Sequence, residues 1–215
     1  MNEPLSSMRM SYELARLGDK DADRDPMAQF SRWFAEVLET HAGEANALIL
    51  STVSPNCVPS SRTVLMKQFD HRGFVFFTNY ESQKGREIAA NPHVAALFYW
   101  SSLQRQVRIG GIATRIGDEE SDAYFQTRPH GSQIGAIVSP QSQEIPNRAW
   151  LEDRFQQAEE ALERGEILKR PNHWGGFRIE PNSMEFWQGR PNRLHDRVVY
   201  RRGVDGSWSM HRLAP

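Results

Sequence analysis

The segment 79–86 carries residue types that bind phosphate. It reads Asn79-Tyr80-Glu81-Ser82-Gln83-Lys84-Gly85-Arg86. Serine is a common helix cap, so Lys84 and Arg86 would lie in a first helical turn. A helix N-terminus with basic side chains attracts phosphate groups. A capped surface helix without a ligand would have the same sequence, so this segment alone leaves both interpretations open.

Tyr124, Arg128 and Ser132 form a second candidate phosphate site. Tyr124 and Arg128 are four residues apart, which places both side chains on one face of a helix. Ser132 follows just after Pro129, where that helix is expected to stop. A guanidinium and two hydroxyl groups can surround a phosphate. The alternative is a core tyrosine beside a solvated arginine.

The segment 185–197 places cations next to aromatic rings. In an extended chain Arg193, His195 and Arg197 point to one face. Two cations that flank a histidine near Trp187 indicate a site for an anion and a flat ring. The alternative is a core tryptophan and a row of solvated arginines that protects a sheet edge.

Short strands and a few helices must position these residues. Asp25 and Pro26 suit the cap and the first position of a helix, and apolar residues recur at helical spacing over 26–41. We expect strands over 47–53, 58–69, 74–78, 93–100, 104–116, 174–179, 184–188, 197–201 and 207–212, and further helices over 82–91, 118–128 and 148–164. Strands and helices do not alternate regularly, which favours a mainly β fold, a barrel with helices outside it.

The N-terminal residues differ from the rest of the chain. Residues 1–25 are polar and end in a charge run over 19–25 that has no apolar period to bury. We therefore predict a mobile N-terminal arm over 1–25 and a single domain over 26–215, as a chain of 215 residues allows.

The composition argues against several classes of function. The chain has 26 Lys+Arg against 27 Asp+Glu, and a net charge of −1 gives no general attraction to nucleic acid. The longest apolar run, 94–100, is far shorter than the ~20 residues of a membrane-spanning helix, and the first residues lack a secretory signal pattern, so we expect a cytoplasmic protein. The seven histidines never fall at H-x-H or H-x-x-x-H spacing, and Cys57 is the single cysteine, so we expect no metal site.

A series of motifs runs in order along nearly the whole chain. It comprises Ser61-Arg62-Thr63-Val64-Leu65-Met66-Lys67, Phe77-Thr78-Asn79, Ser82-Gln83-Lys84-Gly85, Arg105-Gln106-Val107, Arg128-Pro129, Ser132-Gln133-Ile134-Gly135-Ala136, Gln141-Ser142, Trp174-Gly175-Gly176-Phe177-Arg178, Glu185-Phe186-Trp187-Gln188-Gly189, Arg193-Leu194-His195-Asp196-Arg197 and Arg212-Leu213-Ala214-Pro215. This series resembles the pyridoxine/pyridoxamine 5′-phosphate oxidase family. The resemblance implies an antiparallel split β-barrel that binds FMN, and a homodimer with FMN at the subunit interface.

The resemblance also implies the roles of individual residues. The cofactor-binding residues would be Arg62, Thr63, Val64, Leu65, Met66, Lys67, Phe77, Thr78, Gln83, Lys84, Gln106, Gln141, Ser142, Trp187 and Arg197. Of these, Arg62, Lys84, Gln141 and Ser142 would hold the phosphate and ribityl chain of FMN. The substrate phosphate would bind to Lys67, Tyr124, Arg128 and Ser132, and the arm would add Arg9 and Tyr12. The catalytic residues Arg193 and His195 would cover the pyridine ring.

The implied reaction converts pyridoxamine 5′-phosphate and pyridoxine 5′-phosphate to pyridoxal 5′-phosphate. A hydride would pass from C4′ to flavin N5, and oxygen would then be reduced to hydrogen peroxide. Two alternatives remain. A phenazine-type FMN oxidase of secondary metabolism is similar around Ser82-Gln83-Lys84-Gly85, and a flavin-binding module without turnover would also explain the arginines and aromatic residues near the C-terminus.

The chain departs from the usual family pattern at two motifs. A third motif requires an irregularity in its strand. Gln83 stands where an arginine is usual, which removes a fork of charged donors. The arm motif reads Arg9-Met10-Ser11-Tyr12 and matches at its first and last residues. Arg62 and Lys67 are an odd number of residues apart, so a bulge or strand end must lie between them if both bind ligand. Without cofactor, Arg62 and Lys84 would form a cationic cluster with no compensating charge.

Overall fold

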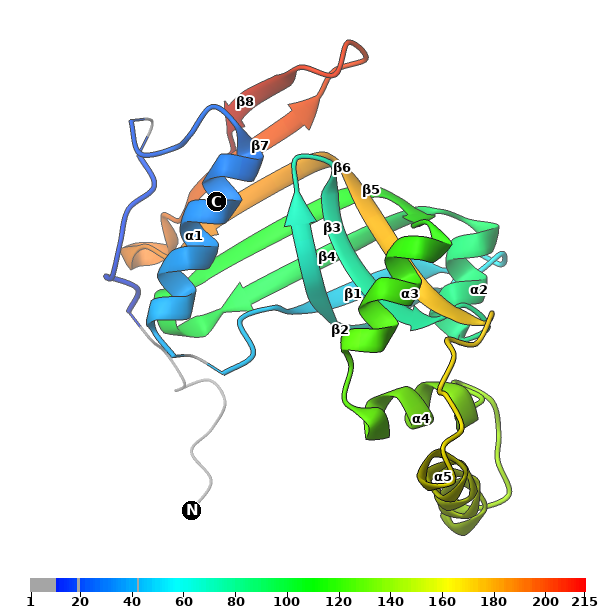
Figure 1. Ribbon diagram of the computed structural model, residues 1–215. Coiled ribbons are helices and arrows are strands. Elements are labelled where there is room, and N and C mark those ends of the chain that lie inside the picture. Colours follow the sequence, from blue (N-terminus) through cyan, green and yellow to red (C-terminus); the bar gives the residue numbers. More distant parts are fainter. Residues whose placement is uncertain (1–10, 19, 42) are drawn as a thin grey trace. The chain divides into compact units, whose positions relative to one another are not determined.

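The computed structural model describes residues 11–18, 20–41 and 43–215, so the predicted arm residue Arg9 lies outside the described residues. Figure 1 shows the helices and strands along these residues. The helices are α1 (Pro26–Glu39), α2 (Gln83–Ala90), α3 (Asp118–Thr127), α4 (His130–Val138) and α5 (Arg148–Glu163), with short 3-10 turns at Ser101–Leu103 and Pro191–Arg193. The strands are β1 (Ala47–Val53), β2 (Pro59–Asp70), β3 (Gly73–Asn79), β4 (His93–Trp100), β5 (Arg105–Arg115), β6 (Trp174–Gln188), β7 (Asp196–Arg202) and β8 (Trp208–Arg212). None of the helices in the described part of the chain has the length and apolar character needed to cross a membrane.

The strands form one hydrogen-bonded series that closes on itself. Their order is β3-β2-β1-β4-β5-β6-β7-β8, and β3 also pairs with β6. The β3–β6 pairing is antiparallel, with Phe76 opposite Phe177, and it joins the two ends of a six-stranded run. The prediction of a mainly β fold with an antiparallel barrel and inserted helices is confirmed.

The chain divides into two compact units. The first contains the described residues up to Ile49 together with Ala95–Gly111 and Pro181–Pro215, and the second contains Leu50–Val94 and Ile112–Glu180. The division into an arm over 1–25 and one domain over 26–215 stays a prediction.

Helix α1 supplies the aromatic core of the first unit. The Asp25 carboxylate accepts a hydrogen bond from the N–H of Met27 at 2.9 Å, which confirms the predicted cap. Phe30 is fully buried, and its ring lies 5.2 Å from that of Phe98 and 5.9 Å from that of Trp100. Tilted aromatic contacts at these distances add to the stabilisation from burial.

The segment before α1 is irregular but attached to the first unit. Leu17 is 1% exposed. Its N–H donates to the Asp196 carboxylate at 3.1 Å, and its carbonyl accepts from Arg212 at 2.8 Å. Arg190 donates to the carbonyl of Ala15 at 3.2 Å. These contacts tie this segment to the loop after β6, to the start of β7 and to β8.

The core of the second unit lies between β3, β6 and α3. Phe76 and Phe177 are buried and stack at 5.7 Å. Phe125 of α3 is fully buried, with its ring 5.4 Å from that of Trp174 at the start of β6. Helices α4 and α5 lie side by side beyond α3 (Figure 1).

Two elements differ from the sequence expectation. The predicted strands 174–179 and 184–188 are one strand, β6, because Pro181 falls between the part paired with β3 and the part paired with β7. A proline at that place removes no hydrogen bond from either of these two pairings. Helix α4 was not expected, since its glycines and β-branched residues have low helix propensity. It is stabilised by burial of Ile134 and Val138.

Candidate active site

The second unit contains a pocket of about 650 Å³ that collects most of the candidate residues of that unit. It is lined by Thr63, Val64, Leu65, Lys67, Phe77, Thr78, Lys84, Tyr124, Thr127, Arg128, Pro129, Ser132, Gln141 and Trp174. Both candidate phosphate sites of the second unit therefore contribute to one cavity. Four candidates of this unit are not among the lining residues, namely Arg62, Met66, Gln83 and Ser142.

Strand β2 borders the pocket with consecutive residues. Thr63, Val64 and Leu65 all line it, so the backbone as well as the side chains faces the cavity. The pairing of β2 with β3 shifts register between Met66 and Gln68, so an irregularity of the kind expected in this strand lies at Lys67. Met66 is 4% exposed and buried in the core, while the bulge lets the exposed Lys67 reach the pocket.

The start of α2 positions Lys84. Ser82 caps the helix by accepting from the N–H of Gly85 at 3.3 Å, as predicted. A Cβ atom on residue 85 would lie 2.1 Å from the carbonyl oxygen of Tyr80, so no side chain fits there. Glycine thus lets the first turn of α2 approach the end of β3.

Lys84 is a buried cation with neutral partners. It is 8% exposed, and its Nζ donates to Gln141 at 2.8 Å, Thr78 at 3.2 Å and Ser82 at 3.5 Å. Within the described chain no carboxylate contacts this ammonium. Burial, and then the charge of Arg62, lower the pKa of Lys84 to about 8. These donors fit a phosphate, which would supply the missing negative charge.

Arg62 does not match the expectation of an uncompensated cationic cluster. Its guanidinium donates to Thr52 at 2.5 Å and Ser60 at 2.6 Å, and it pairs with the Glu87 carboxylate at 3.4 Å. The expectation was wrong because it considered only the cations along the sequence, and Glu87 of α2 supplies the compensating charge. Lys84 is the cation without such a partner.

Arg128 has an unused donor. It lies at the end of α3, 4.6 Å from the centre of the Trp174 ring, and burial lowers its pKa. Its buried Nη1 has no hydrogen-bond partner among the described residues. Tyr124 stacks on Phe77 at 3.8 Å, so both rings border the pocket near Arg128. A buried donor without a partner is unfavourable by about 1–3 kcal/mol, which a phosphate oxygen would relieve.

The first unit holds a separate group of candidates. The Tyr12 ring lies 5.8 Å from both Trp187 and His195, and Trp187 and His195 are 4.6 Å apart. The backbone N–H of Arg190 donates to Nδ1 of His195 at 3.1 Å, so the neutral imidazole carries its proton on Nε2. Burial, and then the charge of Arg193, lower the pKa of His195.

Arg193 does not share a strand face with Arg197. Residues Pro191–Arg193 form a short turn in which Asn192 and Arg193 have φ values of 57° and 62°. Strand β7 begins only at Asp196, so the alternation assumed from the sequence does not reach back to Arg193. The prediction was wrong because proline followed by asparagine favours a turn over an extended chain.

The remaining candidates are Arg197, Gln106 and Ser142, and of these Arg197 lies opposite Trp187 in the pairing of β6 with β7. Arg197 donates to the Glu185 carboxylate at 2.7 Å and to the carbonyl of Ala214 at 2.9 Å. Gln106 is half-buried on β5. Ser142 is exposed and has a φ of 68° directly after Gln141.

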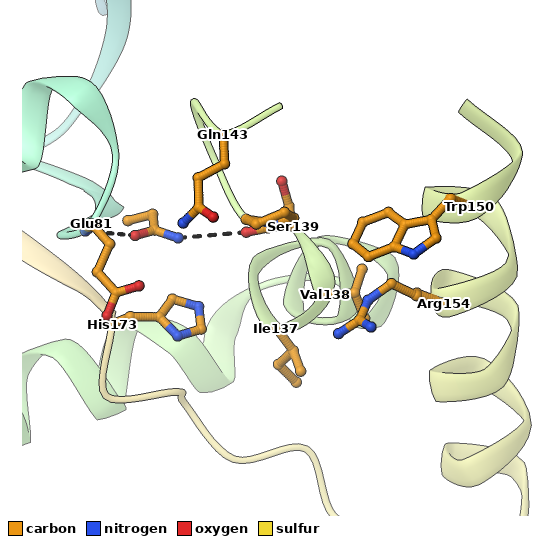
Figure 2. Close-up of a pocket in the computed structure, with 10 residues that line it drawn as sticks. Glu81, Ile137, Val138, Ser139, Gln143, Trp150, Arg154 and His173 are labelled. Atoms are coloured by element: carbon orange, nitrogen blue, oxygen red, sulfur yellow. Dashed lines mark hydrogen bonds between the residues drawn. The ribbon is translucent and has the colours of Figure 1, made fainter. Parts of the chain in front are cut away.

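A smaller pocket of about 230 Å³ lies beside α4 and α5, and Figure 2 shows its lining. Trp150 and Arg154 of α5 form one side, and Glu81 and His173 lie on the other. The side chain of Asn79 joins the N–H of Glu81 at 2.7 Å to the carbonyl of Ser139 at 3.5 Å.

Sequence reasoning missed Glu87 and Trp174 as site residues. Glu87 lies one helical turn after Gln83, whose amide donates to it at 2.9 Å. That spacing was a usable signal. Trp174 stood in a quoted motif, but nothing in the sequence showed that Arg128 would lie over its ring.

Comparison with known proteins identifies the family. Residues 34–161 match the family described as pyridoxamine 5′-phosphate oxidase, and residues 174–215 match the pyridoxine 5′-phosphate oxidase C-terminal dimerisation region. The pyridoxine/pyridoxamine 5′-phosphate oxidase of Ralstonia pickettii is 52% identical over 98% of this chain and 99% of its own length. That of Rubrobacter xylanophilus is 53% identical over 98% of this chain and 96% of its own.

The chain belongs to the pyridoxine/pyridoxamine 5′-phosphate oxidase family. Among solved structures, PhzG from Burkholderia lata in complex with tetrahydrophenazine-1-carboxylic acid has a TM-score of 0.87 and 31% identity, covering 94% of this chain and 99% of that one. A pyridoxamine 5′-phosphate oxidase-related, FMN binding protein from Nostoc punctiforme has a TM-score of 0.73 at 17% identity over 90% of this chain and all of that one, which shows the shared fold. The predicted family and enzyme class are confirmed.

Proposed function

We propose that this oxidase converts pyridoxamine 5′-phosphate and pyridoxine 5′-phosphate to pyridoxal 5′-phosphate with FMN as cofactor. The observation that carries the proposal is that one pocket contains two separate cationic sites. Among the described residues, Lys84 has only neutral hydrogen-bond partners, and the buried Nη1 of Arg128 has no partner. A flavin phosphate and a substrate phosphate would supply one anion to each.

The pocket residues divide between the two ligands. Lys84, Thr78 and Gln141 would hold the phosphate end of FMN, with the backbone of 62–67 along it. Lys67, Tyr124, Arg128 and Ser132 would bind the substrate phosphate, and this remote contact would orient C4′ for reaction. When bound, FMN would supply a two-electron acceptor for the oxidation at C4′ and the reactivity with oxygen that forms hydrogen peroxide.

Arg193 and His195 would cover the substrate ring. The neutral His195 would donate a hydrogen bond from Nε2, and Arg193 and Tyr12 would exclude water from the ring. Trp187, Arg197 and Gln106 would line the flavin. The match of 174–215 to a dimerisation region supports a homodimer, in which we place FMN at the subunit interface.

A phenazine-type oxidation is the second candidate, favoured by the 31% identity to PhzG over nearly the whole chain. Identity of about 50% to named pyridoxine/pyridoxamine 5′-phosphate oxidases favours the vitamin substrate. The test is anaerobic mixing of the yellow protein with pyridoxamine 5′-phosphate, pyridoxine 5′-phosphate or a dihydrophenazine carboxylic acid. We expect the flavin absorbance to bleach with the two pyridoxine-type phosphates. Bleaching only by the phenazine compound, or no bleaching, would refute the proposal.

A further inference from the structure

Glu87 is a buried carboxylate that the proposed reaction does not use. It lies on α2 and is 5% exposed. Its Oε2 accepts from the hydroxyls of Thr52 and Ser60, the latter at 2.6 Å, and pairs with Arg62 at 3.4 Å. Its Oε1 accepts from the Gln83 amide at 2.9 Å. One side chain therefore connects β1, β2 and α2.

The hydrogen bonds keep this carboxylate ionised. Burial alone would raise the pKa of Glu87, but the donors Ser60, Thr52 and Gln83, together with the charge of Arg62, lower it to about 2. Burial of a charged carboxylate destabilises the fold unless hydrogen bonds satisfy its lone pairs. The partners are consequently held in fixed orientations around it.

Two of these partners, Arg62 and Gln83, are among the candidates for cofactor binding that do not line the pocket. Arg62 uses its two terminal nitrogens on Thr52, Ser60 and Glu87, and Gln83 uses its amide on Glu87. Arg62 is also close enough to Lys84 to lower the pKa of that ammonium. Glu87 thus fixes the side chains of Arg62 and Gln83, and its carboxylate pairs with the Arg62 guanidinium.

We propose that Glu87 is a positioning residue for the FMN phosphate: it orients Arg62 and Gln83 beside Lys84. This inference rests on the proposed function. It predicts that replacing Glu87 weakens binding of the FMN phosphate, whereas charge alone predicts stronger binding. Removing a carboxylate beside a phosphate should strengthen binding if only charge mattered. Removing the group that orients the donors should weaken it, since the freed donors lose their geometry.

The test compares FMN with riboflavin, which lacks the phosphate, on the flavin-free full-length chain. Flavin fluorescence quenching gives the dissociation constant of each, and their ratio isolates the contribution of the phosphate. In Glu87→Gln we expect the preference for FMN over riboflavin to fall roughly tenfold or more, about the effect of one charge-assisted hydrogen bond. Glu87→Asp should keep more of the preference for FMN over riboflavin than Glu87→Gln does.

Two further variants separate positioning from charge and from misfolding. Ser60→Ala removes one donor to Glu87 without changing any charge, and we expect a smaller loss in the same direction. Glu81→Gln removes an exposed carboxylate just before α2, and the ratio should stay at the wild-type value. If the wild type fails to bind FMN, the proposed function is wrong. If the wild type binds FMN and Glu87→Gln and Ser60→Ala keep or increase its FMN preference, the role of Glu87 is wrong.

Discussion

The main chain fixes the chemical state of His195. Burial, and then the charge of Arg193, oppose protonation of His195, and the N–H of Arg190 points at Nδ1, so protonation of that nitrogen would also break a hydrogen bond. The pKa of His195 is therefore below its ordinary value, which favours the neutral ring. At the scale of single residues, His195 is suited to donate a hydrogen bond rather than to exchange protons.

Glutamine and asparagine substitutions test this state. His195→Gln places an amide donor near the position of Nε2, while His195→Asn replaces only the Nδ1 side of the ring. We expect kcat/KM for pyridoxine 5′-phosphate to fall several-fold in His195→Gln and at least tenfold further in His195→Asn. Above pH 7 the plots of kcat/KM against pH for the wild type and His195→Gln should be parallel. Equal losses in both variants would show that the Nε2 donor has no role.

Arg128 and Lys67 give a second test at the residue scale. Each would lose a charge-assisted contact to the substrate phosphate on substitution by alanine, at about 1.5–3 kcal/mol, so KM should rise roughly 10- to 150-fold. The flavin content of the purified protein should stay near that of the wild type, since Lys84 is unchanged. Loss of flavin from Arg128→Ala would show that the two phosphate positions are assigned the wrong way round.

At the scale of elements, Glu87 couples α2 to β1 and β2, and this coupling depends on pH. Its pKa of about 2 lies below the ordinary value of 4.5, so the ionised carboxylate stabilises the fold above about pH 4.5. That contribution decreases as the pH falls from 4.5 towards 2. We expect Glu87→Gln to be less stable to urea than the flavin-free wild type at pH 7, and the difference to shrink by pH 3. The same difference at both pH values would contradict the coupling, and Glu81→Gln is the charge control.

The elements also show what a sequence can predict. Asp25, Ser82 and the bulge near Lys67 follow from local rules, since a cap or an odd spacing is set by residues near it in the chain. The continuity of β6 through Pro181 and the existence of α4 depend on pairing and burial against distant residues. The same reason applies to the site: Lys84 was predictable from its helix, whereas the pairing of Arg62 with Glu87 needed two strands and a helix to meet. The predicted strand position of Arg193 was wrong because residues Pro191–Arg193 form a local turn.

For the whole molecule, the attraction for phosphate must be local. The net charge is only −1, and Arg62 is neutralised by Glu87, so no general positive field draws in an anion. The second unit nevertheless contains the desolvated Lys84 and Arg128. Burial of a cation without a counter-ion destabilises the folded chain, and a bound phosphate removes that penalty. FMN should therefore act on the stability of the whole protein as well as on activity.

The stability of the chain with and without FMN tests this linkage. At about 100 times its dissociation constant a ligand adds about 2.7 kcal/mol, which should raise the Tm of the wild type by roughly 5–10 °C. In Lys84→Ala the same FMN concentration should give a much smaller rise, because the affinity falls. Without FMN, the variant should melt at or slightly above the wild-type temperature, since a desolvated charge has been removed. Lys169→Ala removes an exposed lysine and should behave as the wild type in both states. An undiminished FMN-dependent rise in Lys84→Ala would show that the phosphate of FMN binds elsewhere.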